Sequence, residues 1–488
     1  MPLTLTDPDW PAEAAFDPGL ARPLGAGLRG RRYARVPLAG PWGTSLFAKA
    51  LTPGSANRRR AGFEFRVSQA MTRAGIPCPR AWALWEDADR LLLLFEDLGE
   101  RAPLDHDTFL GSPGVLEAAA RAIAAMHEAG LMHRDLHLGN LLQRPDGAPA
   151  LCDFAKARWR PIGHRERLSD LGRLVGSLLP ATHDALCRFA AAYLGEGQPS
   201  DPLCFEIERA GYQRMRDHHA NLDRRARRSI RSGHPQVLRA ERARLAPVLD
   251  APDPDDCFDG AMLKEGSRSR VGRVRLADGR WAVLKHYLPR SGGDPRDRLG
   301  FSKALRSLLA AEALLRRELR AARPLAAWSR PKAGSWLLLE DLPDHRPLDQ
   351  VLVGLGQDAR RALLAETARM VNWMHRLGVA YRDLKPSNLL ADPAAARPDR
   401  LVLIDHDRNR FTRHRAGAAL AMRDLAALHA GLPPAVRASE RLAALREYDP
   451  ALLERAAWRS QIRPLLREAA ERDHRWIPRA LLGAGGRP

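Results

Sequence analysis

The sequence predicts two α+β domains in tandem, and three observations carry this prediction. The chain has 488 residues, of which 45% are hydrophobic and 28% charged, so it can form two or three globular units. Residues 126–142 (MHEAGLMHRDLHLGNLL) match residues 374–390 (MHRLGVAYRDLKPSNLL) without a gap at 9 of 17 positions, at an offset of 248 residues. Each copy begins with short β-rich segments that contain Gly and later becomes helical, notably at 115–130 and 361–378.

Further landmarks recur in the same order in both copies. Each copy has a strand that ends in Lys, a helix with Glu, an apolar strand that runs into Glu-Asp-Leu, the matched block, and a strand that delivers Asp. The residues are Lys49, Glu64, Glu96 and Asp153 in the first copy, and Lys285, Glu312, Glu340 and Asp405 in the second. Because order and residue type are preserved together, about half of the chain is predicted to be a duplication of the other half.

The boundary between the copies is expected in a Pro- and Asp-rich segment. Residues 245–257 (LAPVLDAPDPDDC) have no helix or strand periodicity. We therefore predict an N-terminal extension at 1–19, a first domain at 20–244, a linker at 245–257 and a second domain at 258–488.

The chain is strongly basic, with 78 Lys and Arg against 58 Asp and Glu and a formal charge of +20. Only seven of the cations are Lys, a skew that a codon-level preference explains as readily as a binding surface does. A functional interpretation is attraction to phosphate-rich partners such as an anionic membrane surface or a glycolipid. No specific nucleic-acid partner is expected, because no basic motif is interleaved with aromatic residues.

Cysteine usage and hydropathy indicate a reducing compartment. The five Cys are scattered, odd in number and form no C-x-x-C pair, which argues against a disulfide framework or a zinc site. Residues 1–19 lack the pattern of a signal peptide, and no stretch of 18 apolar residues occurs. We expect a cytoplasmic protein.

The matched block carries the chemistry of phosphoryl transfer. In each R-D-L-x-x-x-N loop a carboxylate lies five residues before an amide, as Asp135 before Asn140 and Asp383 before Asn388. A tight loop can aim the carboxylate at an acceptor hydroxyl while the amide oxygen binds Mg²⁺. The strand-borne Asp153 and Asp405 would supply the second oxygen ligand of that metal.

The remaining landmarks suit the phosphates of ATP. Lys49 and Lys285 would contact the α- and β-phosphates, each held by a helix carboxylate, Glu64 or Glu312, with Glu318 as the alternative to Glu312. Gly-containing stretches at 25–30 and 266–272 would cover the phosphates, or would be ordinary hairpins. Their predicted ATP-binding members are Gly25, Gly27 and Gly266.

These residues resemble the protein-kinase-like superfamily over roughly 20–200 and 258–435. Residues 381–388 (YRDLKPSN) are similar to a protein-kinase catalytic loop, whereas 133–140 (HRDLHLGN) resemble the loops of aminoglycoside phosphotransferases and lipopolysaccharide kinases. Residues 264–271 (KEGSRSRV) and 404–408 (IDHDR) resemble the start and the metal-binding segment of bacterial lipopolysaccharide core kinases of the heptose or Kdo type.

The resemblance implies two bilobal domains, each with a small β-rich N-lobe and a helical C-lobe. It implies ATP and Mg²⁺ as cofactors, Asp135, Asp383 and Lys385 as catalytic residues, and Glu96 and Glu340 as further ATP-binding residues. It also implies an ATP-dependent phosphotransferase of the lipopolysaccharide-kinase type, with peripheral contact at the inner face of the inner membrane as a further expectation.

The predicted acceptor is a sugar or a lipid-linked sugar. The usual Asp-Phe-Gly is Asp-Phe-Ala at 153–155 and Asp-His-Asp at 405–407, which makes a mobile switch less expected there. Asp153 lies only 17 residues before Asp170, Asp405 only 19 before Asp424, and neither interval contains Ala-Pro-Glu, so the platform that docks a peptide is missing.

Alternative interpretations stay open for the role of two Asp residues and for the function of the chain. Asp170 and Asp424 are predicted either to brace the catalytic loops from a buried position or to cap helices. A Ser/Thr protein kinase is the alternative enzyme, supported by residues 381–388, and a pseudokinase scaffold with one or both repeats inactive is the alternative outside catalysis.

Overall fold

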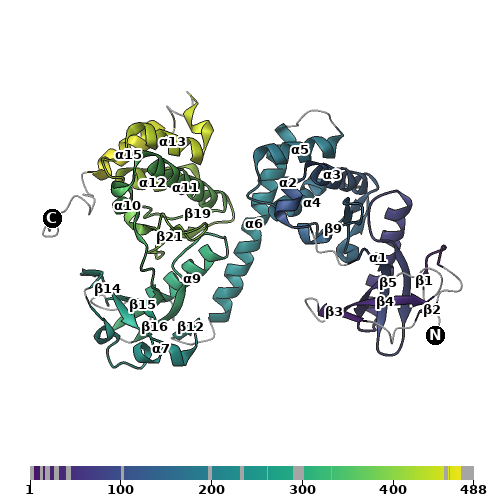
Figure 1. Ribbon diagram of the computed structural model, residues 1–488, viewed down its shortest axis with the longest axis horizontal. Coiled ribbons are helices and arrows are strands. Elements are labelled where there is room, and N and C mark those ends of the chain that lie inside the picture. The colour runs from purple at the N-terminus through teal and green to yellow at the C-terminus, as the bar shows by residue number, and fades with distance from the viewer. Residues whose placement is uncertain are drawn as a thin grey trace. The chain divides into compact units, whose positions relative to one another are not determined.

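The chain forms two compact units, Met1–Met215 and Arg216–Pro488, each a mixture of helices and sheet (Figure 1). This computed structural model describes residues 5–10, 15–16, 22–26, 32–39, 45–99, 104–195, 201–230, 236–260, 262–289, 302–330, 332–454, 460 and 462–473. The mixed architecture and its occurrence in both halves agree with the tandem α+β prediction.

The first unit begins with an antiparallel sheet of seven strands in the order β1-β6-β7-β5-β4-β2, with β3 also paired to β4. The strands are β1 (Leu5–Thr6), β2 (Ala15–Phe16), β3 (Arg22–Ala26), β4 (Arg32–Ala39), β5 (Ser45–Leu51), β6 (Ala81–Glu86) and β7 (Leu91–Glu96). The apolar β7 is buried along Leu91–Phe95, as expected for a central strand with both faces covered.

Helix α1 (Ser55–Arg73) covers one face of this sheet. Its Phe65 packs with Leu91 and Leu93 of β7, whereas Leu92 and Leu94 pack with Val36 on the opposite face. This alternation is the side-chain period of a strand, and it holds α1 against the strand that neighbours β5.

The rest of the first unit is mainly helical. Its helices are α2 (His106–Gly111), α3 (Pro113–Glu128), α4 (His164–Gly176), α5 (His183–Leu194) and the first part of α6 (Asp201–Ile230). Two short antiparallel pairs lie among them, β8 (Leu131–Met132) with β11 (Arg158–Trp159) and β9 (Leu141–Gln143) with β10 (Pro149–Leu151). The first matched block runs from the end of α3 to β9, and Asp153 follows β10.

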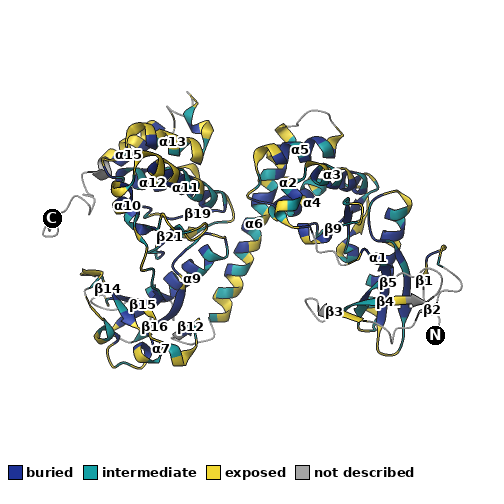
Figure 2. Cartoon of the chain, viewed as in Figure 1, coloured by how far each residue is buried: buried dark blue, intermediate teal, exposed yellow. Residues whose placement is uncertain are grey.

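The second unit repeats this plan with a six-stranded sheet in the order β12-β16-β17-β15-β14-β13. The strands are β12 (Gln236–Leu238), β13 (Lys264–Gly266), β14 (Ser269–Arg275), β15 (Trp281–Tyr287), β16 (Pro324–Arg330) and β17 (Gly334–Glu340). Helix α9 (Lys303–Leu315) packs on β16 and β17 and is largely buried (Figure 2).

Helices again follow the sheet. They are α10 (Leu348–Gly354), α11 (Gln357–Arg376), α12 (Ala418–Ala430), α13 (Ala438–Tyr448) and α15 (Arg463–Asp473). Five short strands pair among these helices: β18 (Arg346–Pro347), β19 (Val379–Ala380), β20 (Leu389–Ala391), β21 (Leu401–Leu403) and β22 (Arg410–Phe411). The second matched block runs from the end of α11 to β20, and Asp405 follows β21.

The division between the units differs from the boundary expected from the sequence. It falls within α6, whose Arg216 donates to the carbonyl oxygen of Arg376 at 2.7 Å and whose Asp223 pairs with Arg316 and Arg317 of the second unit. The C-terminal part of α6 therefore belongs to the second unit.

The segment 245–257, expected to be a linker, is packed against the second sheet. It comprises the end of α7 (Arg242–Leu249) and a 3₁₀ turn (Pro254–Cys257), and Leu245 and Val248 are buried with Trp336. Asp255 accepts hydrogen bonds from the indole of Trp336 and lies 2.8 Å from Nδ1 of His286. Its Pro and Asp residues thus form a turn with specific partners, which composition alone does not distinguish from a solvated linker.

Among the residues that the structure describes, no helix combines the length and the apolar character needed to cross a bilayer.

Candidate functional site

Lys49 is the centre of a buried group of charges in the first unit. Its Nζ lies 2.8 and 2.9 Å from the two carboxylate oxygens of Glu64 and 2.8 Å from Oδ1 of Asp153. Burial alone would lower the pKa of Lys49, but the attraction of Glu64 and Asp153 raises it above its ordinary value. The ammonium is therefore held charged beside a carboxylate that is separated from it by 104 residues of sequence.

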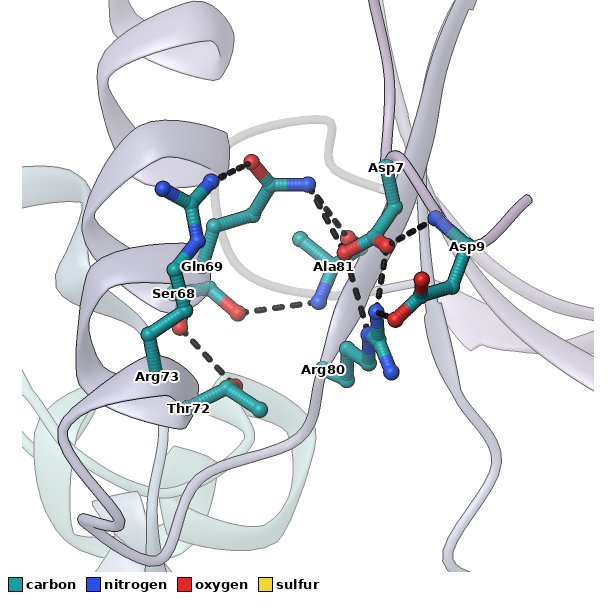
Figure 3. A network of polar contacts seen from close by, with 8 residues as sticks. All are labelled: Asp7, Asp9, Ser68, Gln69, Thr72, Arg73, Arg80 and Ala81. Atoms are coloured by element: carbon teal, nitrogen blue, oxygen red, sulfur yellow. Dashed lines mark hydrogen bonds and ion pairs between the residues drawn. The ribbon is translucent and has the colours of Figure 1, made fainter.

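The helix that carries Glu64 is fixed to the sheet by a polar network on its neighbouring turn (Figure 3). Ser68 donates to the carbonyl oxygen of Pro79 at 2.7 Å and accepts from the backbone N–H of Ala81 at 2.9 Å. Gln69 donates to Asp7 at 2.9 Å, and Arg80 forms an ion pair with the same Asp7. These bonds tie α1 to β1 and β6, so the position of Glu64 is set by the sheet.

A buried aspartate braces the first R-D-L-x-x-x-N loop. Asp170 is fully buried in α4 and accepts from the backbone N–H groups of His133 at 2.6 Å and Arg134 at 2.9 Å. Its position inside α4 excludes the helix-cap alternative and confirms the bracing role. Burial would raise the pKa of Asp170, but the interaction with His127 and the backbone N–H of Arg134 lower it below its ordinary value, so the brace is ionised.

The loop presents Asp135 at its partly exposed edge. The side-chain amide of Asn140 donates to the carbonyl oxygen of Asp135 at 2.8 Å, which leaves the amide oxygen as the group suited to a metal. Lys156, which the sequence analysis did not assign to the site, lies 2.5 Å from the Asp135 carboxylate. Lys156 stands three residues after Asp153, a position that no motif had marked.

The second unit repeats the Lys–Asp contact. Nζ of Lys285 lies 2.7 Å from Oδ1 of Asp405 and 4.9 Å from the ring centre of Tyr287. Burial opposes ionisation of Asp405, but Lys285 prevails and lowers the pKa of that carboxyl to about 2. Each unit therefore brings the Lys of a sheet strand into contact with the Asp that follows the matched block.

The ion pair expected between Lys285 and Glu312 is not formed. Glu312 instead pairs with Arg239 and lies 3.6 Å from Arg316, and the alternative Glu318 is exposed just beyond the end of α9. No helix carboxylate of the described segments contacts Lys285, which distinguishes this unit from the first.

Backbone geometry identifies the residue that takes the place of Glu64. After α1, Gly75 has a positive φ of 71° and the N–H of Ile76 bonds back to Met71, and after α9 Glu318 has a positive φ of 59° and Leu319 bonds back to Leu314. Eleven residues before these two positions lie Glu64 and Ser307. Ser307 is fully buried and its hydroxyl is 2.9 Å from that of Tyr287.

The segments 152–156 and 404–408 contain the predicted metal ligands Asp153 and Asp405 and are called the metal-side segments. A different ion pair joins α9 to the metal-side segment of the second unit. Nζ of Lys303, the first residue of α9, lies 2.9 Å from Asp407, two residues after Asp405. The same ammonium lies 4.9 Å from the ring centre of Tyr287. The link between helix and metal-side segment is present in both units, but the charge that the helix contributes is negative in the first and positive in the second.

The second loop is braced like the first, with one exchange of residue type. Asp424 is buried within α12 and accepts from the backbone N–H groups of Tyr381 at 2.7 Å and Arg382 at 2.6 Å. The Tyr381 hydroxyl donates to the carbonyl oxygen of Ile404, the residue before Asp405. In the first unit His133 reaches the corresponding carbonyl oxygen of Cys152 at 3.0 Å, so Tyr replaces His in the same contact.

Asp383, Lys385 and Asn388 lie together in this second loop. The amide of Asn388 donates to the carbonyl oxygen of Asp383 at 2.9 Å, and Lys385 Nζ is 3.8 Å from the Asp383 carboxylate. Lys385 thus stands beside its Asp from within the loop, whereas the first loop has His137 at that position and receives Lys156 from outside.

The other predicted ATP-binding residues that the structure describes lie on the two sheets. Gly266 ends β13 at a tight turn into β14, and Gly25 lies in β3, whereas Gly27 lies outside the described residues. Glu96 and Glu340 end the central strands β7 and β17, where Glu340 accepts from Arg320 at 2.7 Å and Glu96 from the N–H of Arg80 at 3.3 Å.

The donor set of each unit fits a hard divalent cation. Asp153 and Asn140 in the first unit, and Asp405 and Asn388 in the second, offer carboxylate and amide oxygens, and each Asp side chain is 26% exposed. Both Asp residues have a positive φ, 58° and 66°, which turns them out of their strands beside the loops. Such oxygen ligands suit Mg²⁺.

Comparison with known proteins bears directly on this arrangement. A sequence profile described as the lipopolysaccharide kinase (Kdo/WaaP) family matches residues 44–193 and again 273–444. The chain belongs to this family. The first match includes Lys49 and the second Lys285, and each also includes an R-D-L-x-x-x-N loop and the strand-borne Asp that follows it.

Several curated relatives of this chain are named 3-deoxy-D-manno-octulosonic acid kinases. The 3-deoxy-D-manno-octulosonic acid kinase of Stenotrophomonas maltophilia (strain R551-3) is 30% identical over 177 residues, 33% of this chain and 70% of the relative. The enzyme of the same name from Xanthomonas euvesicatoria pv. vesicatoria (strain 85-10) is 33% identical over the same shares. That of Xanthomonas campestris pv. campestris (strain B100) is 36% identical over 129 residues, 25% of this chain and 52% of the relative. This member of the Kdo/WaaP family is accordingly a kinase, a phosphotransferase.

Proposed function

We propose that this kinase transfers the γ-phosphate of ATP to a hydroxyl group of a sugar or a lipid-linked sugar. The observation that carries the proposal is the group around Lys49, which joins the sheet, α1 and the strand-borne Asp153 within hydrogen-bond distance. In each unit the sheet with its helix would form the small N-lobe of a kinase-like domain, and the helical remainder the C-lobe.

The roles of the residues in the first unit follow from their chemistry. Lys49 binds the α- and β-phosphates as a fixed ammonium, and Glu64 keeps it in place. Asp135 orients the acceptor hydroxyl and accepts its proton as the bond to phosphorus forms. Asn140 and Asp153 hold Mg²⁺, which when bound neutralises charge on the triphosphate.

The second unit offers the same roles with one difference. Lys285, Asp383, Asn388 and Asp405 correspond in chemistry and position to the set above, and Lys385 adds a cation beside the catalytic carboxylate. No helix carboxylate of the described residues fixes Lys285, so its position depends on Asp405 and on Tyr287. We propose that both units bind ATP and that the first is better organised for turnover.

The acceptor is proposed to be a glycolipid rather than a protein. Helix α4 begins at His164 and α12 at Ala418, so each strand-borne Asp is followed closely by the next helix and little chain is available to dock a peptide. Because the relatives are named 3-deoxy-D-manno-octulosonic acid kinases, a lipid-linked glycan that contains this sugar is the first acceptor to test. The charge of +20 supports peripheral contact with an anionic membrane surface, at the inner face of the inner membrane.

Transfer of labelled phosphate from ATP tests the proposal. The full chain is incubated with glycolipid that contains 3-deoxy-D-manno-octulosonic acid, and separately with a peptide library. We expect label in the glycolipid, a partial loss in Asp135→Asn or Asp383→Asn, and loss of at least about a thousandfold in the double variant. Asp107→Asn, at a fully exposed carboxylate, is the matched control. Label in peptides alone, or a double variant as active as the control, would overturn the proposal.

A further inference from the structure

Two cysteines and a histidine that are scattered in the sequence converge in the first unit. His183 and Cys187 lie one turn apart at the start of α5, and Cys204 lies in the first turn of α6. The imidazole Nε2 of His183 is 3.5 Å from Sγ of Cys187, and its Nδ1 is 3.5 Å from Sγ of Cys204. One ligand atom from each of the three residues lies within 4.8 Å of the other two.

A carboxylate lies near one of the two sulfurs. Oδ1 of Asp201, the first residue of α6, is 3.6 Å from Sγ of Cys187. The three side chains of the cluster come from the N-terminal turns of two helices and offer two sulfurs and one imidazole nitrogen. This is a mixed set of the kind that binds Zn²⁺.

The spacings suit a tetrahedral ion. With Zn–S bonds of about 2.3 Å and Zn–N or Zn–O bonds of about 2.0 Å, the edges from sulfur to nitrogen or oxygen in a tetrahedron are about 3.5 Å. Only one imidazole nitrogen can bind the ion, so one of the two sulfur–nitrogen contacts, 3.5 Å long, is such an edge, and the other nitrogen of the ring makes the second contact, also of 3.5 Å. The ligand atoms of the three residues lie within 4.8 Å of one another, so small side-chain movements bring them to the distances that a shared ion requires.

Ordinary packing explains the cluster less well. Cys187 and Cys204 are free thiols that are buried, whereas His183 is exposed. A thiol is a weak hydrogen-bond partner, so two thiols gain little from surrounding one imidazole that water could solvate instead. The exposed His183 also gives an ion a route from solvent to the buried sulfurs.

We propose that His183, Cys187 and Cys204 form a binding site for Zn²⁺ or a similar thiophilic divalent ion, with water as the fourth ligand. On binding, both thiols release their protons to solvent and form sulfur–metal bonds, with no change of oxidation state. Because its protein ligands come from two helices, the ion would fasten the start of α5 to the start of α6, which is a structural role.

The fastening concerns a helix that contacts the catalytic side of the unit. Near the other end of α5, the Tyr193 hydroxyl lies 2.8 Å from Nδ1 of His127 in α3. His127 in turn lies 3.6 Å from Asp170, which braces the loop of Asp135. A metal at the start of α5 would stabilise the support of this loop without touching phosphate or acceptor.

Metal analysis of the full chain tests the site. Protein purified with reductant and without chelator is expected to contain about one Zn²⁺ per chain. Replacement by Co²⁺ is expected to give the absorption of thiolate-to-cobalt charge transfer, which oxygen-ligated Co²⁺ at a magnesium site does not produce. Cys187→Ser and Cys204→Ser should lose both signals, whereas Cys257→Ser, at a partly exposed cysteine of the second unit, should keep them.

A ligand at the surface guards against misfolded variants. His183→Ala changes an exposed side chain and is expected to weaken Zn²⁺ binding at least tenfold and to abolish the rise in melting temperature that Zn²⁺ gives the wild type. Reduced wild-type protein that takes up neither Zn²⁺ nor Co²⁺ with a thiolate spectrum would overturn the proposal. A disulfide between Cys187 and Cys204 in protein prepared without reductant, together with failure of the reduced form to bind metal, would do the same.

Discussion

Glu64 and Glu312 are equivalent as sequence landmarks but differ in the structure, and one pair of variants distinguishes the two. Glu64 is 2% exposed and holds Lys49 through both carboxylate oxygens, whereas Glu312 pairs with Arg239 and Arg316 away from Lys285. We expect Glu64→Gln to lower the activity of the first unit strongly and Glu312→Gln to leave that of the second unchanged.

The magnitude follows from the burial of the Lys49 pair. Removing one partner of a buried ion pair costs about 3–5 kcal/mol, but Asp153 still contacts Lys49, so about 3 kcal/mol is reasonable for Glu64→Gln. If the transition state loses this whole free energy of stabilisation, kcat/KM for ATP falls about a hundredfold. The pairs of Glu312 are nearer the surface and are worth at most about 1 kcal/mol of stability.

Each variant must be assayed with the other unit silent. Glu64→Gln is combined with Asp383→Asn and Glu312→Gln with Asp135→Asn, and initial rates of phosphate transfer from ATP are compared with those of the single Asn variants. Circular dichroism and thermal unfolding check that each protein is folded. If Glu312→Gln costs the second unit as much as Glu64→Gln costs the first, the assignment of Ser307 to the position of Glu64 is wrong.

Three further predictions concern single side chains. Lys156→Met should lower kcat of the first unit about tenfold and change KM for ATP less than twofold, because Lys156 contacts the Asp135 carboxylate; an unchanged kcat contradicts this. Tyr381→Phe should destabilise the second unit by about 1–2 kcal/mol, because the Ile404 carbonyl oxygen loses its donor, and Tyr381→His should restore part of the melting temperature. Burial lowers the pKa of His219 from 6.5 to about 4, so the folded state gains stability from the neutral imidazole in full above pH 6.5. This stability is lost as the pH falls from 6.5 toward 4, by up to about 1.4 kcal/mol per pH unit. His219→Gln should therefore flatten the dependence of melting temperature on pH between about 7 and about 5.

The parts of the site that lie on strands and in the short loops were predictable from sequence. A strand that ends in Lys and a strand that delivers Asp are fixed by apolar runs, and the Lys49–Asp153 and Lys285–Asp405 contacts follow from them. The sequence leaves open whether Asp170 braces the loop or caps a helix. Its position inside α4 and its hydrogen bond from the backbone of His133 decide for the brace.

The register of α9 could not be predicted from the same landmarks. A helix presents Glu to solvent as readily as to a buried Lys, so the presence of Glu312 did not fix which face is turned inward. The end of α1 is marked by Gly75, a recognisable cap, whereas α9 ends before Glu318, which adopts a positive φ without being Gly. With this signal absent, counting back from the helix end to Ser307 required the structure.

Two other features depended on pairing in three dimensions. Composition predicts that Pro254 and Asp255 are linker residues, because it does not reveal that the indole of Trp336 donates to Asp255. Spacing along the chain does not predict that Cys187 and Cys204 approach, because they meet only where α5 and α6 begin side by side around His183.

The two units hold the ammonium group of their strand Lys in different ways. An ammonium must be held beside an aspartate that is itself partly buried, and the first unit does this with a second carboxylate on the helix, Glu64. In the second unit the ring of Tyr287 lies 4.9 Å from both Lys285 and Lys303, and such cation–π contacts are worth about 1–2 kcal/mol each where water is excluded. Lys303 then pairs with Asp407, so the helix is still linked to the metal-side segment, but without a carboxylate that could follow Lys285 when it binds phosphate. Loss of this partner is the physical reason to expect slower turnover in the second unit although its R-D-L-K-P-S-N loop is the more similar of the two to that of a protein kinase.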